Sequence, residues 1–210
     1  MDEHELQGVM EERMLGYRFL SQVYRSAPTV DFLRALQAAN PPEEAALSSF
    51  VAGLQDADLE ALKIDLGAEY VRVLLNMGPS PVAPYESVYT SPEKLLMQDA
   101  RDEVVAAYRR EGLAATTDTS EPEDHLATEF EFMAYLCEKT SLAAKEGKHE
   151  MAEHYVAAQK DFFTQHIVSW VPLFCDDFDK QVKTDYYKAL STLTRQHIAM
   201  DEDFLENAAS

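Results

Sequence analysis

The sequence of 210 residues predicts an all-α protein, and three observations lead to this prediction. Apolar residues recur every three or four positions along almost the whole chain, which is the period of an amphipathic helix. No region sustains the apolar–polar alternation of a β-strand. Only seven glycines are present, too few for a sandwich of many tight turns or for glycine-rich phosphate loops. With 46% hydrophobic residues, we expect one domain over residues 1–210 with a sizeable core.

Four helices are predicted in the first part of the chain, with apolar stripes through residues 6–24, 30–36, 47–54 and 59–74. Pro28 ends the first stripe, because proline removes a backbone donor and blocks the helix before it. Pro41 and Pro42 pre-set the first turn of the third helix. Asp56 or Asp58 then caps the fourth helix, because a carboxylate accepts from free N–H groups there.

A proline-rich connector follows at residues 78–92 and joins two helical halves. It contains four of the nine prolines: Pro79, Pro81, Pro84 and Pro92. Each of them fixes φ and removes a donor, so the sequence predicts that this stretch is not helical. Tyr85, Val88 and Tyr89 favour an ordered loop over a free linker, because disordered linkers rarely carry so many large apolar side chains.

The second half predicts further helices separated by clear stop signals. Ser91-Pro92-Glu93 is typical of a helix start, and Gly112 is a natural stop. After a loop at 113–119, Ser120 and Glu123 have the spacing of a capping box, with Pro122 near the helix start. The remaining features are a helix ending near Gly147, another from Met151 to Trp170 broken by Pro172, a last one through residues 174–193, and an acidic tail at 201–210.

The net charge of the chain disfavours anionic binding partners. Eighteen Lys and Arg stand against 38 Asp and Glu, a net charge of −20. We therefore expect no nucleic-acid binding and no stable membrane association, since both surfaces are anionic. The N-terminus, Met1-Asp2-Glu3, has neither a basic start nor an apolar run, which predicts a cytoplasmic protein. Cys137 and Cys175 form no CxxC pair and are predicted to be reduced thiols in or near the core.

Neither metal chemistry nor catalysis is indicated by the sequence. His149 and His154 are five residues apart, roughly 140° around a helix, so they cannot chelate one ion together. The Glu146–His149 spacing of a di-iron helix straddles a predicted break at Gly147. No nucleophile elbow, catalytic cysteine signature or phosphate loop is present. We therefore expect a protein that is not an enzyme and holds no cofactor.

The stretch from Asp118 to Glu131 holds six acids and no Lys or Arg. Acids in a first helical turn stabilise the helix dipole by about 0.3–1 kcal/mol each, and a solvated face explains Glu129. The same cluster also suits a guanidinium, which pairs with carboxylates through two parallel hydrogen bonds. The residues alone leave both interpretations open.

At this point the sequence resembles a known family. Residues 121–125, Glu-Pro-Glu-Asp-His, followed by the helix of residues 129–133, resemble the Glu-Pro-x-Asp-His signature of the TorD/DmsD family of molybdoenzyme chaperones. Three further blocks are similar in order and spacing: residues 84–89, 108–113 and 166–174. The resemblance spans about residues 65–175, roughly half of the chain, and its combined motifs are specific.

The resemblance implies an all-helical fold of two halves joined by a hinge, and a role in maturation before export. Members of the family bind the twin-arginine leader peptide of a molybdenum oxidoreductase, and some also bind its apo catalytic subunit. Some bind the cofactor, some form domain-swapped dimers, and some bind guanine nucleotide weakly. We expect a monomer or a domain-swapped dimer here, and the chain has no glycine-rich phosphate loop to support nucleotide binding.

A twin-arginine leader offers two guanidinium groups followed by an apolar stretch, so its receptor needs carboxylates beside an apolar groove. Asp124 and Glu123 are expected to supply the carboxylates. His125 either orients a carboxylate or carbonyl, or is a satisfied histidine at the helix start. The full set of expected peptide-binding residues is Tyr85, Ser87, Val88, Tyr89, Glu121, Pro122, Glu123, Asp124, His125, Phe130 and Met133.

A second function class remains open at this stage. A generic acidic helical adaptor would bind another protein through its helix faces, with residues 121–125 serving only as a helix cap. Dependence of leader binding on Asp124 and His125 separates the two hypotheses.

Overall fold

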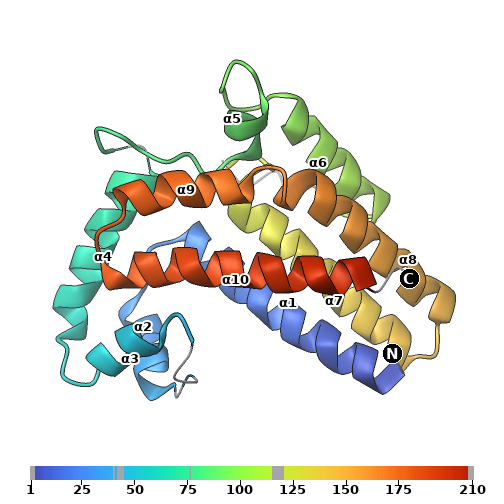
Figure 1. The fold of residues 1–210 in the computed structure, drawn as a ribbon, viewed down its shortest axis with the longest axis horizontal. Helices are drawn as coiled ribbons and strands as arrows, with labels where there is room; N and C mark the ends of the chain where they lie inside the picture. Colours follow the sequence, from blue (N-terminus) through green and yellow to red (C-terminus); the bar gives the residue numbers. More distant parts are fainter. Residues whose placement is uncertain (1–2, 40, 42–44, 76, 115–120, 208–210) are drawn as a thin grey trace. The chain divides into compact units, whose positions relative to one another are not determined.

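The computed structural model describes residues 3–39, 41, 45–75, 77–114 and 121–207. Within these residues the only regular secondary structure is helical, which confirms the predicted all-α class (Figure 1). In chain order the helices are α1 (Glu3–Arg25), α2 (Val30–Ala38), α3 (Ser48–Gly53), α4 (Leu59–Leu74), α5 (Glu86–Thr90), α6 (Asp99–Arg110), α7 (Leu126–Lys145), α8 (His149–Phe162), the π-helix η1 (Phe163–Ile167), α9 (Val171–Gln181) and α10 (Asp185–Asn207). None of the described helices is long and apolar enough to cross a membrane.

The chain divides into two compact units, each assembled from separate segments. The first unit comprises residues 1–24, 85–171 and 198–210, and the second comprises 25–84 and 172–197. The boundary at Pro84 and Tyr85 falls inside the proline-rich connector. Since the chain also passes between units at three other points, the connector is one of four links rather than the single joint between two halves.

The core of the first unit is built on α7, which is buried over most of its circumference. Thirteen of its twenty residues are buried. The apolar stripe of α1 packs against it, with the rings of Tyr17 and Tyr24 lying 5.8 and 6.2 Å from that of Phe130. Gly147, at φ 68°, ends the turn after α7, as the sequence predicted, because glycine adopts the left-handed conformation without steric cost.

The second unit has its own core around α4 and the first half of α10. Leu66, Tyr70 and Tyr187 are buried there, and the Tyr187 hydroxyl donates to the carbonyl of Leu66 at 3.1 Å. Glu69 of α4 fixes the start of α10, because its carboxylate accepts from the backbone N–H groups of Lys183 and Thr184. A carboxylate satisfies N–H groups that the beginning of a helix leaves without partners.

Both cysteines are buried and free, as predicted. Cys137 lies in α7 and Cys175 in α9, and burial raises the pKa of each thiol to about 12. A thiol at that pKa is almost entirely protonated near neutral pH and is therefore a poor nucleophile.

Several predicted element boundaries are wrong. The single last helix expected through residues 174–193 is two helices, α9 and α10, separated at residues 182–184. The helix expected from Ser91 begins only at Asp99, because residues 91–98 form a loop tied at Gln98 to the Ser87 hydroxyl. The connector contains a helical turn, α5, in the proline-free stretch 86–90. The acidic residues 201–207 continue α10, and Asp201 is buried.

The predicted start of the helix after residue 120 is also displaced. Ser120 lies outside the described residues, so the capping box is untested. The helix itself, α7, begins at Leu126, which places Pro122 ahead of the first turn. Its N-cap is His125, whose Nδ1 accepts from the backbone N–H of Ala127 at 3.0 Å. The break before Pro172 is confirmed, since η1 ends at Ile167 and α9 starts at Val171.

Candidate functional site

The turn at residues 121–125 packs directly against α5, so the structure brings together two blocks that lie far apart in the sequence. Tyr85 and His125 form an isolated antiparallel bridge, and their rings meet edge to face with centroids 5.0 Å apart. The Asp124 carbonyl accepts from the N–H of Glu86 at 3.0 Å. The Asp124 carboxylate accepts from the N–H of Ser87 at 2.9 Å. The acidic turn therefore holds the beginning of α5.

Glu123 is already paired with a guanidinium, that of Arg101 in α6. The two side chains form a two-bond fork, with Nε–Oε2 at 2.6 Å and a second N–O contact at 2.8 Å. This pairing holds the pKa of Glu123 below its usual range. Sequence reasoning missed Arg101, since nothing in the local pattern predicts a partner 22 residues away. Glu121 is exposed, and it accepts a hydrogen bond from the Tyr85 hydroxyl.

The expected site residues divide by exposure. Glu121 is exposed, and Tyr85, Val88, Tyr89, Pro122 and Glu123 are partly exposed. Ser87, Asp124, His125, Phe130 and Met133 are buried. Phe130 and Met133 are core residues, so the expectation that they line a surface groove is wrong for this conformation. Asp124 is fully buried, ahead of the first turn of α7 and not within it, and offers no surface to a ligand.

A buried polar network lies behind α5. His166 of η1 contacts both carboxylate oxygens of Glu86, with Nδ1 at 3.2 and 3.0 Å. The Trp170 indole donates to Glu129 Oε2 at 3.0 Å. All four residues are buried, at most 3% exposed. The interpretation of Glu129 as part of a solvated face is therefore wrong, and sequence reasoning missed the network because its members come from three separate segments.

Glu129 holds its proton more tightly than an ordinary glutamate. Burial raises its pKa well above the usual range, and the charge of Glu86 raises it further. Its Oε1 has no hydrogen-bond partner among the described residues. The Trp170–Glu129 and His166–Glu86 contacts tie α7 and α5 to the segment that carries η1 and Trp170.

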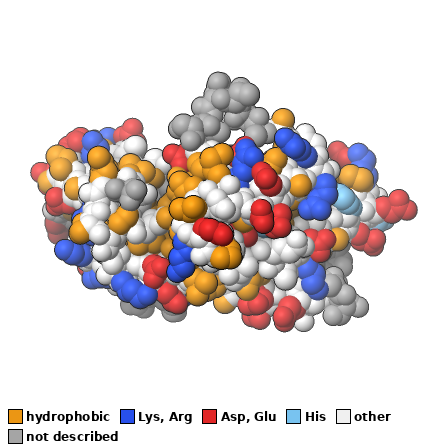
Figure 2. Space-filling view, turned by 90° about the horizontal axis from the view of Figure 1, so that it is seen from above, with side chains coloured by type: hydrophobic (Ala, Val, Ile, Leu, Met, Phe, Trp, Pro, Cys, Tyr) orange, Lys and Arg blue, Asp and Glu red, His pale blue; other side chains and the backbone are white. Residues whose placement is uncertain are grey.

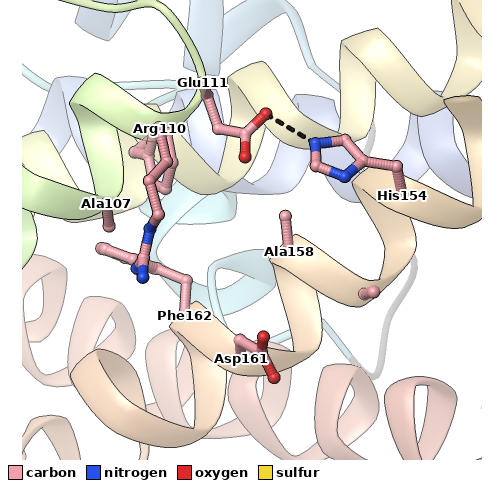
Figure 3. Close-up of a pocket in the computed structure, with 9 residues that line it drawn as sticks. Ala107, Arg110, Glu111, His154, Ala158, Asp161 and Phe162 are labelled. Carbon is pink, nitrogen blue, oxygen red and sulfur yellow. Dashed lines mark hydrogen bonds and ion pairs between the residues drawn. The ribbon is translucent and has the colours of Figure 1, made fainter.

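A separate small pocket of about 190 Å³ lies in the first unit, between α6, α7 and α8 (Figure 3). Phe132 and Phe162 are buried in its floor, and His154 contacts Glu111 at its rim with Nε2–Oε2 at 3.1 Å. The full lining is Ala107, Arg110, Glu111, Phe132, His154, Ala157, Ala158, Asp161 and Phe162. None of the expected peptide-binding residues lines it. Among the residues that the structure describes, no group of three or more His, Cys, Asp or Glu is arranged to hold a metal.

Comparison with known proteins matches the family features seen in the sequence. The family model for the nitrate reductase delta subunit matches residues 36–176, more than half of the chain. The chaperone protein TorD of Vibrio cholerae serotype O1 strain O395 is 29% identical over 193 residues, covering 87% of this chain and 81% of the relative.

The TorD chaperone of Aliivibrio salmonicida is 24% identical over 215 residues, covering 96% of this chain and 98% of the relative. The crystal structure of a putative redox enzyme maturation protein from Archaeoglobus fulgidus is also similar. It has a TM-score of 0.48 and 22% identity, and the match covers 90% of this chain and 93% of that chain. On the match to the family model over residues 36–176, the chain belongs to the nitrate reductase delta subunit family, the family of the TorD-like chaperones.

Proposed function

We propose that this protein is a cytoplasmic chaperone, not an enzyme, that assists maturation of a molybdenum-cofactor oxidoreductase before export. It binds the twin-arginine leader of that client, its apo catalytic subunit, or both. It acts as a monomer or a domain-swapped dimer. Membership of the family and relatives named as TorD chaperones support the general role. The net charge of −20 suits a cationic leader.

One observation carries the leader-binding proposal. The acidic turn at 121–125 and the aromatic residues of α5 form one continuous assembly, with Glu121 exposed beside the partly exposed Tyr85. The Tyr85–Glu121 hydrogen bond lies at the surface, so an incoming guanidinium can replace the hydroxyl. A charged donor bonds a carboxylate roughly twice as strongly as a neutral one.

The expected site residues then take two different roles. Glu121, Glu123, Pro122, Tyr85, Val88 and Tyr89 form the contact surface. Ser87, Asp124, His125, Phe130 and Met133 position that surface from below. Asp124 is the clearest positioning residue, because its carboxylate accepts from Ser87 N–H at the start of α5.

The contact role predicts coupling between Glu121 and the leader arginines. Calorimetry would use a peptide with two adjacent arginines before an apolar segment, and a second peptide with lysines in their place. For the wild-type protein, we expect the lysine peptide to bind about tenfold more weakly, because lysine lacks the planar fork. For the Glu121→Gln variant, the affinities of the two peptides should differ much less. Glu153→Gln, an exposed acid of α8 in the same unit, is the matched control and should behave like wild type.

If Glu121→Gln prefers the arginine peptide over the lysine peptide as strongly as wild type does, Glu121 does not contact the leader arginines. Binding that ignores both the arginines and residues 121–125 would instead favour the generic helical adaptor. The positioning role has its own signature. Asp124→Ala should weaken the binding of both peptides by the same factor. Asp124→Asn should recover much of the lost affinity, since its amide oxygen can still accept from the Ser87 N–H.

A further inference from the structure

The loop between α5 and α6 exposes three large apolar side chains in a row. Leu95, Leu96 and Met97 are 58%, 46% and 61% exposed, and we name them the Leu95–Met97 ledge. Among the described residues this is the only run of three consecutive exposed large apolar side chains. Single exposed apolar residues are ordinary on soluble proteins, whereas a contiguous group marks an interaction site.

The backbone of the loop is held in an uncommon conformation. Lys94 and Met97 have φ values of 52° and 57°, in the left-handed region that non-glycine residues rarely occupy. Hydrogen bonds fix the loop at both ends: Lys94 N–H donates to the carbonyl of Ser91, and Gln98 N–H donates to the hydroxyl of Ser87. Strained residues persist where the surrounding structure over-determines them, and they cluster at ligand-binding segments. The loop held in this way leaves the three apolar side chains exposed.

Acidic side chains border the ledge. Glu93, Asp99, Asp102 and Glu103 are exposed, while Lys94 is the exposed cation among residues 93–103. Arg101 in the same helix bonds Asp102 at 3.0 Å and also Glu123, which ties this acidic rim to the turn at 121–125. Figure 2 views the protein from the side where α5 lies in Figure 1, and it shows hydrophobic, acidic and basic side chains interspersed on that face.

We propose that the Leu95–Met97 ledge is the docking place for the apolar segment that follows the two arginines of the leader. This inference rests on the proposed leader binding and adds the surface that takes the apolar part. The acidic rim selects an occupant that is apolar and next to cations. It disfavours a second copy of this chain, whose net charge is −20, and an anionic lipid surface.

The contacts place this ledge next to the rest of the site. Ser87, whose hydroxyl accepts from Gln98 N–H, is the same residue whose N–H is held by Asp124. One short segment, α5, therefore connects the acidic turn to the ledge. A leader whose arginines meet Glu121 has its following residues available to reach the ledge across α5.

The test uses fluorescence anisotropy with two labelled peptides of equal length. Both carry two adjacent arginines; in one they precede a leucine-rich segment, and in the other a serine- and glycine-rich segment. The ledge variant is Leu95→Ser/Leu96→Ser/Met97→Ser. Its matched control is Leu15→Ser/Leu142→Ser/Met151→Ser, which removes side chains 60%, 46% and 44% exposed in the same unit. Leu95→Ser alone gives a milder second variant, and circular dichroism melting verifies that each variant folds.

We expect the ledge variant to bind the leucine-rich peptide at least tenfold more weakly than wild type does. It should bind the serine-rich peptide unchanged, and the control variant should match wild type with both. Equal affinity of the ledge variant and wild type for the leucine-rich peptide would overturn the ledge proposal while leaving leader binding intact. Failure of wild type to bind either peptide would instead overturn the proposed leader binding itself. Wild-type dimerisation in light scattering that the ledge variant abolishes would reassign the ledge to self-association.

Discussion

Glu129 shows how one buried carboxyl group can set the protonation of a site. It is fully buried, it accepts from the Trp170 indole, and the charge of Glu86 acts on it. A buried carboxyl group without a cationic partner favours its neutral form, because ionisation in an apolar setting is costly. Glu86, whose charge also favours the neutral form of Glu129, contacts His166.

This arrangement predicts a stability that falls as pH rises. The pKa of Glu129 is raised in the folded state, so that state binds the proton more tightly than the unfolded chain does. Its stabilising contribution is complete below the unfolded pKa of about 4.3 and is lost as pH rises from there toward the folded pKa. Glu129→Gln keeps the neutral donor and acceptor and removes the titration. In urea unfolding near pH 5, 6.5 and 8, we expect the variant to gain stability relative to wild type, by at most about 1.4 kcal/mol per pH unit.

Glu131→Gln is the control for this experiment, because Glu131 is an exposed acid two residues along the same helix. Its stability relative to wild type should change little over the same pH range. A Glu129→Gln variant whose unfolding free energy follows the wild-type pH profile would show that Glu129 titrates normally.

At the scale of elements, α5 is a single helical turn that its own sequence cannot sustain. Five residues are far too few for an isolated helix, since nucleation is costly. The turn exists because tertiary contacts hold it: Asp124 binds the Ser87 N–H, and the ring of Tyr89 packs 5.5 Å from that of Trp170. The segment that carries the aromatic part of the proposed site therefore depends for its shape on the turn at residues 121–125 and on Trp170.

A double substitution tests whether this segment forms a wall of the site. Tyr85→Ala/Tyr89→Ala should weaken leader binding about tenfold or more while leaving the helical circular dichroism nearly unchanged. Trp170 is the single tryptophan of the chain, so its fluorescence also reports on the loss of Tyr89. Tyr155→Ala, at a partly exposed tyrosine of α8 in the same unit, is the control and should retain wild-type affinity. Unaltered affinity in the double variant would place the leader elsewhere.

The sequence predicted the helices that local pattern decides and failed where distant contacts decide. The apolar stripes of α1, α4 and α7, and the glycine stop at Gly147, follow from residues within one or two turns. The predicted start of α6 was wrong because Pro92 is a good first-turn signal, yet the chain forms a loop, tied by a hydrogen bond from Gln98 N–H to the Ser87 hydroxyl, until Asp99. Of the site, the juxtaposition of the two motif blocks was anticipated, but the burial of Asp124 and Glu129 was not.

At the scale of the whole molecule, the first unit is closed by contacts between the two ends of the chain. Arg13 of α1 pairs with Asp201 near the end of α10, and both side chains are buried, at 7% and 2% exposure. The Tyr17 hydroxyl also donates to Asp201, and Arg13 donates to Gln159 of α8. A pair 188 residues apart cannot be seen in local periodicity, and Asp201 was predicted to lie in an acidic tail. Closure of this unit therefore needs almost the entire chain.

The final prediction concerns what this buried pair contributes. Removing the charge of one partner leaves the other charge uncompensated in the core, so Asp201→Asn should lower the free energy of unfolding by about 3–5 kcal/mol. Replacing both partners with apolar residues, Arg13→Met/Asp201→Leu, removes the buried charges together and should cost clearly less than the single change. Asp185→Asn, an exposed acid at the beginning of the same helix, is the control and should stay within about 0.5 kcal/mol of wild type.

Urea unfolding of wild type and the three variants measures these differences in the free energy of unfolding. The leader affinity of the folded variants should be unchanged, because neither Arg13 nor Asp201 belongs to the proposed site. If the double variant loses as much stability as Asp201→Asn or more, the two buried charges are not coupled. The hydrogen bonds of Arg13 to Gln159 and of Tyr17 to Asp201 would then carry the stabilisation separately. If the single variant is as stable as wild type, water must reach the pair, and the closure of the first unit must rest on the apolar contacts of α1 with α7 alone.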